Sequence, residues 1–274
     1  MALSVKFWGV RGSIACASPD HVVFGGNTSC LEVMADGQRI ILDAGTGIRD
    51  LGRELLVSGV KETVILLTHV HWDHISGFPF FAPAFTPGFK LDIYAGHLMD
   101  AGGVENVFSG QMANPTFPVP LSALQADITF NDFRAGENVQ IFTNINIATL
   151  PLNHPNGATG YRISCAGKSI CYITDTEHVV GELDQSIVSF IKGADLVVYD
   201  STYTDAQFSE KIGWGHSTWE EGVRLCKAAE AKKIAIFHHD PDHDDKFMFD
   251  IERQAKNAWE GAVVAREQMS IALA

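Results

Sequence analysis

The stretch that decides the fold is Thr63-Val64-Ile65-Leu66-Leu67-Thr68-His69-Val70-His71-Trp72-Asp73-His74. Its first part, residues 63–67, is a continuous apolar run, which is typical of a strand covered on both faces in a parallel sheet. The run leads directly into three histidines and an aspartate. Reactive side chains at the carboxyl end of a buried strand are usual in α/β active sites. The stretch therefore predicts an α/β protein with a site at this strand end.

The four polar side chains His69, His71, Asp73 and His74 are suitable ligands for zinc and its first-row neighbours. One tetrahedral site cannot use all four, because the adjacent Asp73 and His74 must point away from His69 and His71. We therefore expect two metal ions, which hydrolytic sites commonly hold about 3.5–4 Å apart. The alternative is that the three histidines are solvated on a loop.

The rest of the chain alternates short β-branched runs with helical patterns, and no linker interrupts it, which predicts one α/β domain over residues 1–274. Strands are expected at 29–35, 39–43, 63–67, 138–150, 161–164, 169–174, 196–199, 234–237 and 262–265, and helices at 48–56, 183–191, 218–231 and 246–258. Residues 78–120 are rich in Phe, Pro and Gly. We expect much of this segment to be an ordered loop that forms a wall or lid over the site.

The composition is that of a globular protein, with 274 residues, a hydrophobic share of 46% and a formal net charge of −13. No run of about 18 apolar residues would span a membrane, and the N-terminus lacks an apolar signal segment, so we expect a cytoplasmic protein. Five cysteines without CxxC spacing argue against disulfides and a thiolate zinc site. The excess of acidic residues predicts no bulk binding of nucleic acid.

Four further segments accompany the HxHxDH pattern of residues 69–74. They are Leu42-Asp43-Ala44-Gly45, Asn153-His154-Pro155-Asn156-Gly157, Tyr172-Ile173-Thr174-Asp175-Thr176 and Ile236-Phe237-His238. In this order and spacing, the chain resembles the metallo-β-lactamase superfamily. The opening Gly9-Val10-Arg11-Gly12-Ser13 and the later Gly25-Gly26-Asn27-Thr28-Ser29 resemble the branch that contains ribonuclease Z and bacterial phosphodiesterases.

The resemblance implies a four-layer αββα sandwich of two mixed β-sheets. It also implies that His69, His71 and His154 hold one divalent metal, that Asp73, His74 and His238 hold another, and that Asp175 bridges the two. Zinc is the expected metal, while Mn²⁺ and Fe²⁺ are also compatible with such ligands.

Taken alone, several of these residues have simpler interpretations. His154 lies in a Pro/Gly/Asn loop and could be a surface histidine, and Asp175 could cap a helix. His238 is preferred to His239 as a ligand because it directly follows a predicted buried strand. His243 is expected to be solvated on an acidic turn.

The segment Gly215-His216-Ser217-Thr218 resembles the His-Ser-Thr segment of ribonuclease Z, where the histidine belongs to the active site. The alternative is that His216 is an ordinary neighbour of a helix cap. Asp43 is expected to orient a ligating histidine, or else to bond local backbone. Asp200 could orient His216 or cap a turn. Arg11 and Lys168 could meet a phosphate, although exposed charges are the preferred interpretation of both.

These residues predict a dinuclear metal-dependent hydrolase, in which a metal-bound hydroxide attacks a phosphodiester. Asp73 is expected to be both a ligand and the group that handles the proton of the nucleophile. His216 is expected to donate a proton to the leaving alkoxide or to neutralise developing charge. The alternatives are a glyoxalase II-like thioesterase or lactonase, a transfer RNA 3′-processing endonuclease, and a non-catalytic metal-binding sensor.

The expected substrate is a small phosphodiester, such as a cyclic nucleotide or an alkyl or aryl diester, and not precursor transfer RNA. Lys90 is the only lysine between His74 and His154, where ribonuclease Z carries a basic arm. Apolar walls suit a nucleobase or another small organic group. No membrane partner is expected. A homodimer is compatible with the sequence, which leaves the oligomeric state open.

Overall fold

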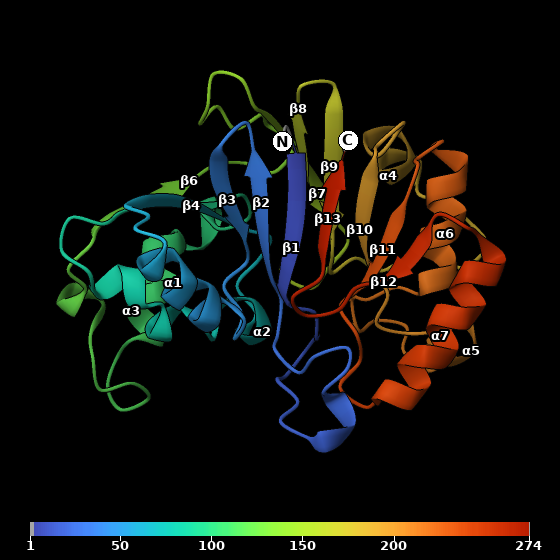
Figure 1. Cartoon of the computed structure of the whole chain (residues 1–274), viewed down its shortest axis with the longest axis horizontal. Coiled ribbons are helices and arrows are strands. Elements are labelled where there is room, and N and C mark those ends of the chain that lie inside the picture. The colour runs from blue at the N-terminus through green and yellow to red at the C-terminus, as the bar shows by residue number, and fades with distance from the viewer. Residues whose placement is uncertain (1–2, 274) are drawn as a thin grey trace.

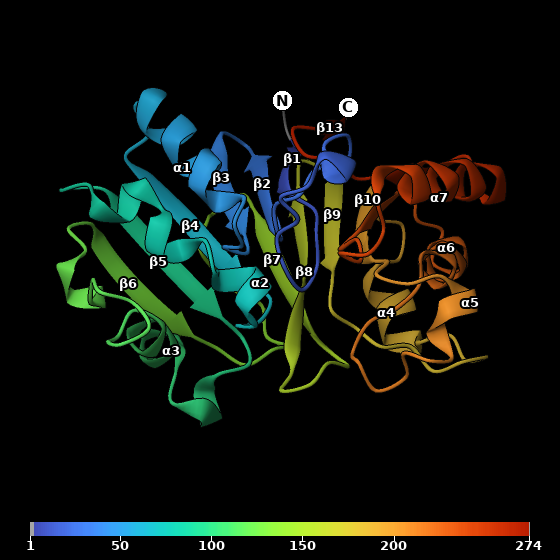
Figure 2. The same cartoon turned by 90° about the horizontal axis from the view of Figure 1, so that it is seen from below.

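Two β-sheets lie face to face between two groups of helices in the computed structural model, which describes residues 3–273 (Figure 1 and Figure 2). The first sheet has the order β13 (Ser270–Leu273), β1 (Leu3–Gly9), β2 (Cys30–Ala35), β3 (Gln38–Leu42), β4 (Glu62–Leu67), β5 (Lys90–Ala95) and β6 (Asp127–Asp132). The second has the order β12 (Ala262–Val264), β11 (Ile234–Phe237), β10 (Leu196–Asp200), β9 (Lys168–Ile173), β8 (Ala158–Cys165) and β7 (Asn146–Leu152).

The helices cover the outer face of each sheet. They are α1 (Ile48–Val57), α2 (Trp72–Ile75), α3 (Val104–Gln111), α4 (Gln185–Phe190), α5 (Asp205–Phe208), α6 (Trp219–Ala228) and α7 (Asp245–Ala258). Short 3-10 turns lie at Pro19–His21, Phe78–Phe80, Ala82–Phe85, Met99–Ala101 and Leu121–Ala123. Helices α1 to α3 lie beside the first sheet, and α4 to α7 lie beside the second (Figure 1).

Both sheets are mixed. In the first, β3 to β6 are parallel and β1 pairs antiparallel with β2 and β13. In the second, β9 to β12 are parallel, whereas β7, β8 and β9 are antiparallel. Strand β4 therefore lies inside a parallel group, as its apolar sequence predicts.

Three apolar layers explain the stacking. Phe7, Leu66, Tyr172 and Phe237 belong to a core between the two sheets. A second core joins the second sheet to α6 and α7, and a third joins the first sheet to α1 and α3. The predicted four-layer αββα sandwich is confirmed.

The prediction of a loop over residues 78–120 is wrong for β5 and α3. Residues 90–95 alternate between exposed or half-buried and buried positions, and this strand pairs with β4 and β6. The prolines lie outside both elements, and Pro79 and Pro83 occupy the first turns of 3-10 helices, where the missing N–H is tolerated. Proline content over the whole segment concealed the short regular elements between the prolines.

Other element boundaries also differ from the predictions. Strand β7 begins at Asn146, later than predicted, and the strands β1, β6 and β13 were not predicted. Helix α6 begins as its sequence indicates, since the Thr218 hydroxyl accepts a hydrogen bond from the Glu221 N–H.

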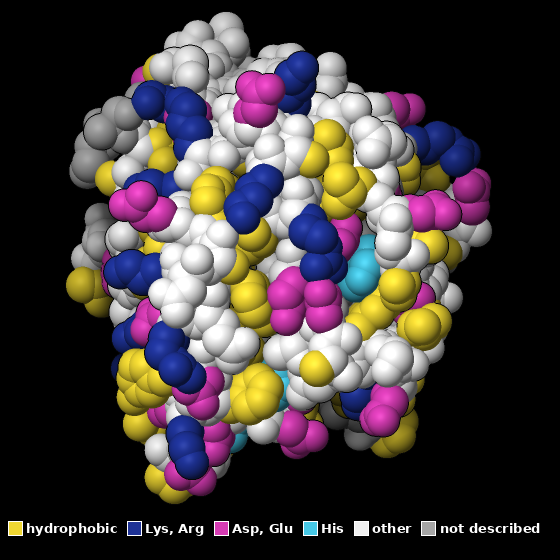
Figure 3. All heavy atoms as spheres, turned by 90° about the vertical axis from the view of Figure 1, so that its right-hand side faces the viewer, with side chains coloured by type: hydrophobic (Ala, Val, Ile, Leu, Met, Phe, Trp, Pro, Cys, Tyr) yellow, Lys and Arg dark blue, Asp and Glu magenta, His cyan; other side chains and the backbone are white. Residues whose placement is uncertain are grey.

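On the face covered by α5 to α7, acidic and basic side chains are interspersed (Figure 3). Neither sign of charge forms a broad field on that face. None of the helices within residues 3–273 is both long and apolar enough to cross a membrane.

Candidate metal centre

The predicted site residues are brought together by strand ends of both sheets. Strand β4 leads into His69 and His71, and α2 then carries Asp73 and His74 on its buried side. From the second sheet, His154 follows β7, Asp175 follows β9 and His238 follows β11. Because parallel strands present their carboxyl ends at one edge, segments far apart in the sequence converge here.

The first group consists of His69, His71 and His154, whose ligand atoms lie within 4.8 Å of one another. The His154 Nε2 atom is 3.0 Å from the His71 Nδ1 atom. The buried His69 Nε2 atom has no hydrogen-bond partner among the described residues. Burial lowers the pKa of all three histidines. This shift favours the neutral imidazole, which is the form that binds a metal.

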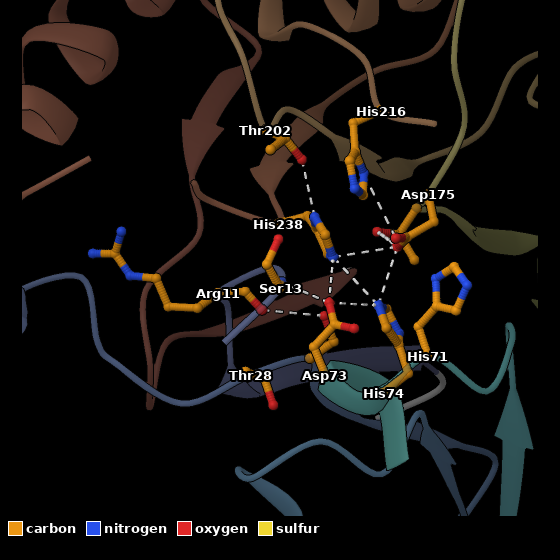
Figure 4. A network of polar contacts seen from close by, with 12 residues as sticks. Arg11, Ser13, Thr28, His71, Asp73, His74, Asp175, Thr202, His216 and His238 are labelled. Atoms are coloured by element: carbon orange, nitrogen blue, oxygen red, sulfur yellow. Dashed lines mark hydrogen bonds and ion pairs between the residues drawn. The ribbon is translucent and has the colours of Figure 1, made fainter. Parts of the chain in front are cut away.

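The second group consists of Asp73, His74, Asp175 and His238, all buried. The His238 Nε2 atom is 3.2 Å from Asp73 Oδ2 and 3.3 Å from His74 Nε2 (Figure 4). Burial opposes ionisation, yet the adjacent His74 and His238 hold the pKa of Asp73 well below its ordinary value. The pKa of Asp175 is also held well below its ordinary value against burial, by His238, His74 and His69. Both buried carboxylates thus favour the anionic form, which favours a cation between them.

Asp175 contacts both groups through different oxygens. Its Oδ1 atom is 3.6 Å from His69 Nε2 and 3.7 Å from His154 Nε2. Its Oδ2 atom is 3.2 Å from His74 Nε2 and 3.4 Å from His238 Nε2. The carboxylate therefore lies between the groups, with one oxygen directed to each.

The donor set fits divalent cations. The unpartnered His69 nitrogen and the facing imidazole nitrogens of His71 and His154 leave lone pairs that a metal would satisfy. In the second group, burial opposes protonation of His74, but Asp175, Asp73 and Asp43 raise its pKa well above the ordinary value. This part of the site attracts positive charge, as a cation site must.

Surrounding hydrogen bonds orient the ligand candidates. The His74 Nδ1 atom is 2.8 Å from Asp43 Oδ2, and Asp43 also accepts bonds from Thr68 and the Tyr172 hydroxyl. The His154 Nδ1–H donates to the Gly215 carbonyl at 2.7 Å. Partners of this kind fix the tautomer and leave the opposite ring nitrogen available to a metal. Asp43 thus lies where an orienting carboxylate is expected.

His216 lies beside both groups. Its Nδ1 atom is 3.1 Å from Asp200 Oδ2 and 3.6 Å from Asp175 Oδ1. Its ring stacks on the His238 ring, and the two ring centroids are 4.9 Å apart. Burial disfavours the imidazolium, but Asp200 overcomes this effect and the pKa of His216 rises to about 9. Asp200, which sequence reasoning left undecided, contacts His216 directly.

Arg11 and Lys168 do not line the cluster. The Arg11 side chain is fully buried, points away from the histidines and donates to the carbonyls of Gly25, Asp240 and His243 (Figure 4). It is therefore not the exposed charge that we expected. Lys168 is the first residue of β9, and its Nζ atom is 3.7 Å from Asp195 Oδ1.

His239 and His243 point elsewhere. The His239 Nε2–H donates to the Ala265 carbonyl at 2.9 Å. The expectation of a solvated His243 is wrong, because its ring stacks on Phe247 at 4.0 Å and the residue is buried. The acidic sequence around it concealed this packing.

Three neighbours of the cluster were missed by sequence reasoning. The Ser13 N–H donates to Asp73 Oδ2 at 2.7 Å, and a Cβ at Gly12 would overlap the His238 ring. Both ring nitrogens of His97 are buried and lack partners within the part of the chain that the structure describes. Burial, assisted by His71 and His154, lowers the pKa of His97 to about 4. Only the fold brings these residues to the site.

Comparison with known proteins places the chain in a family. Residues 38–239 match the family model described as the beta-lactamase superfamily domain. The chain belongs to this superfamily. It is 22% identical to ribonuclease Z of Clostridium perfringens, over 84% of this chain and 88% of that protein, and 21% identical to ribonuclease Z of Haloarcula marismortui, over 97% and 95%. With the His/Asp cluster, this membership makes the protein a metal-dependent hydrolase.

Solved structures share the fold of this superfamily member. A diphosphatase from the PhnP family has a TM-score of 0.72 at 19% identity, covering 99% of this chain and 98% of that chain. The short form of human tRNase Z has a TM-score of 0.68 at 20% identity, covering 99% of both chains. Zn²⁺-bound PqqB from Methylobacterium extorquens has a TM-score of 0.72 at 17% identity, covering 98% and 100%.

One expectation about partners is wrong. Net charge led us to expect no bulk binding of nucleic acid, but the curated relatives that align over most of the chain are ribonucleases. The physical reason is that a net charge sums over the whole surface, whereas contact with a polyanion depends on the local arrangement of charge.

Proposed function

We propose that the protein is a dinuclear phosphodiesterase whose substrates include small phosphodiesters. In this proposal, His69, His71 and His154 hold one divalent ion, Asp73, His74 and His238 hold a second, and Asp175 bridges them. The position of Asp175, with one oxygen toward each group, is the observation that supports two ions. The nitrogen-rich ligand set favours Zn²⁺, with Mn²⁺ or Fe²⁺ as the alternatives.

When bound, two such ions lower the pKa of coordinated water and withdraw charge from a phosphoryl oxygen. Asp73 is placed to take the proton of the attacking water. Its Oδ2 atom is engaged by the Ser13 N–H and lies near His238. Among the described residues the polar contacts of this carboxylate all involve Oδ2, which leaves Oδ1 for the proton.

His216 favours phosphorus chemistry over carbonyl chemistry. Its Nδ1 atom is held by Asp200, so Nε2 is the atom that can donate to a leaving alkoxide. A cationic imidazole beside the cluster also stabilises the additional negative charge of a phosphoryl transition state. Burial disfavours the charged ring, but the Asp200 carboxylate raises the pKa of this imidazole to about 9, which favours the protonated form.

RNA processing is the second candidate. The ribonuclease Z relatives cover most of the chain, so an RNA 3′ end is a reasonable substrate of the same centre. Both candidates use the same bond chemistry and differ in what holds the rest of the substrate.

The cytoplasm remains the expected location, since all five cysteines are unpaired.

The test begins with metal analysis of the purified protein. Turnover is then measured on cyclic nucleotides, aryl phosphodiesters, a transfer RNA precursor, a thioester and a lactone. We expect about two metal ions per chain, hydrolysis of diesters and inactivation by a chelator. Asp175→Asn should remove activity and metal, whereas Asp92→Asn on β5 serves as a carboxylate control and should not. Turnover restricted to the thioester or lactone, or no turnover by the metal-loaded protein, would contradict the proposal.

A further inference from the structure

A cavity of about 450 Å³ lies on the other side of α2 from the candidate metal centre. Its lining includes Val70, Trp72, Phe80, Val107, Gln111 and Phe117. Within α2, Asp73 and His74 contribute to the metal cluster, whereas Trp72 and Ile75 line the cavity. This short helix thus forms the wall between the two, and a helix with its side chains is about 10–12 Å across.

The segment that carries His71 lies between the cavity and the centre. His71 is the one half-buried residue of its histidine group, and its chain neighbours Val70 and Trp72 both line the cavity. A substrate whose phosphate contacts the centre can therefore extend past His71 into this space.

The side chains that line the cavity suit a ligand group that is uncharged and planar. Among the described residues that line the cavity, none is charged. Trp72 and Phe80 are 83% and 57% exposed, which is unusual for large aromatic side chains. Phe80 meets Phe117 edge to face at 5.8 Å, so ring faces remain open to stacking. A phosphate would not bind here, whereas an aromatic ring would.

Gln111 adds a hydrogen-bond requirement. Its Nε2–H donates to the Ile75 carbonyl at 2.9 Å, which fixes the orientation of the amide. Its Oε1 atom is buried and has no partner within residues 3–273. A buried acceptor of this kind is costly unless a ligand supplies an N–H. Nucleobases carry N–H groups on their edges, and a simple aryl ring does not.

We infer that this cavity is a binding subsite for a nucleobase of the substrate. The base stacks on the aromatic side chains while one of its N–H groups donates to Gln111. The inference rests on the proposed phosphodiesterase function and specifies its substrate class as nucleotide diesters. It applies equally to a small nucleotide and to the terminal residue of an RNA.

The test compares two diesters that differ only in the base, namely the methyl esters of adenosine 5′-monophosphate and of ribose 5-phosphate. With metal-loaded protein, we expect kcat/KM to be at least about tenfold higher for the adenosine ester, the usual effect of stacking one base. Phe80→Ala and Gln111→Met should each lower kcat/KM far more for the adenosine ester than for the ribose ester, and so remove most of this preference. Phe249→Ala, an exposed aromatic on α7, is the matched control and should leave the preference unchanged.

Binding of adenosine itself, followed by tryptophan fluorescence and repeated with Trp72→Phe, separates the subsite from the chemistry. Binding without turnover of either ester would support the subsite and contradict the phosphodiesterase proposal. Equal kcat/KM for the two esters, with no adenosine binding, would overturn the subsite and leave the phosphodiesterase standing. A methyl aryl diester without an N–H group could instead give the same increase in kcat/KM over the ribose ester as the adenosine ester does. That result would overturn the assignment to a nucleobase.

Discussion

The imidazole of His216 is the side chain on which the proposed chemistry depends most directly. We expect His216→Ala to lower kcat about 10²- to 10⁴-fold, because it removes a proton donor, while metal content stays unchanged. Steady-state kinetics and metal analysis of the same preparation check this. Loss of metal, or an unchanged kcat, would place His216 in a different role.

His239 provides a pH prediction for stability. Burial and the nearby Arg11 lower its pKa in the folded chain to about 3, while an unfolded histidine titrates near 6.5. The unfolded state therefore binds more protons as the pH falls, and stability contributed by the neutral ring is lost below about pH 6.5. We expect about 2 kcal/mol less stability at pH 5 than at pH 7 from this residue.

Urea unfolding of the metal-free protein at both pH values measures the effect. His239→Gln can still donate to the Ala265 carbonyl but does not titrate, so its stability should fall by about 2 kcal/mol less than that of the parent protein. Equal losses in the two proteins would mean that His239 is not the group responsible.

Individual ligand candidates could be predicted from the sequence because motif and strand end coincide in His69 to His74. The side chains that orient them could not all be predicted in this way. Gly12 and Ser13 lie in the opening motif, but that motif does not indicate which ligand they contact, and His97 carries no local signal. Their place at the site depends on how the first sheet brings distant loops together.

The loop after β1 supports the strand end of β11. Gly12 packs directly on the His238 ring, where a Cβ would overlap it. We expect Gly12→Ala to displace this ring and weaken metal binding about 10- to 100-fold, the usual effect of disturbing the orientation of a ligand. Competition with a chromogenic chelator measures the affinity.

Gly110→Ala on α3 is the control for metal affinity, because a Cβ at that position meets nothing within 4 Å. Circular dichroism should show that both variants are folded. Metal affinity equal to that of the parent protein in Gly12→Ala would show that the His238 ring can move without loss of binding.

Helices and strands whose apolar residues recur with a clear period were predictable from the sequence, and those without such a period were not. Helix α6 has an N-cap and an apolar stripe, and the sequence predicts it. The sequence does not predict β5 and α3, because prolines flank both elements. Strand β6 has mostly exposed or half-buried residues, and it is a strand because it pairs with β5. Pairing is a tertiary property that a local pattern does not contain.

The candidate ligands join the two sheets. His69 to His74 follow the first sheet, and His154, Asp175 and His238 follow the second. Bound metal should therefore stabilise the molecule as a unit, by about 4 kcal/mol when free metal exceeds the Kd about 1,000-fold. We expect a chelator to lower Tm by roughly 10 °C in calorimetry.

Restoring the metal should restore Tm, and a His69→Ala variant should respond less to the chelator than the parent protein. An unchanged Tm after verified removal of metal would show that the two sheets are held together without it.

Asp43, Asp175 and His238 each follow a strand in the left-handed backbone region, with φ of 61°, 59° and 63°. Such a conformation is unfavourable by about 1 kcal/mol or more for residues with a Cβ, and is easiest for glycine and asparagine. Selection for folding alone would therefore favour glycine or asparagine at these three positions. Their persistence would require selection for activity, and a library screened only for thermal resistance in the absence of metal should drift toward glycine and asparagine at these positions as catalysis is lost.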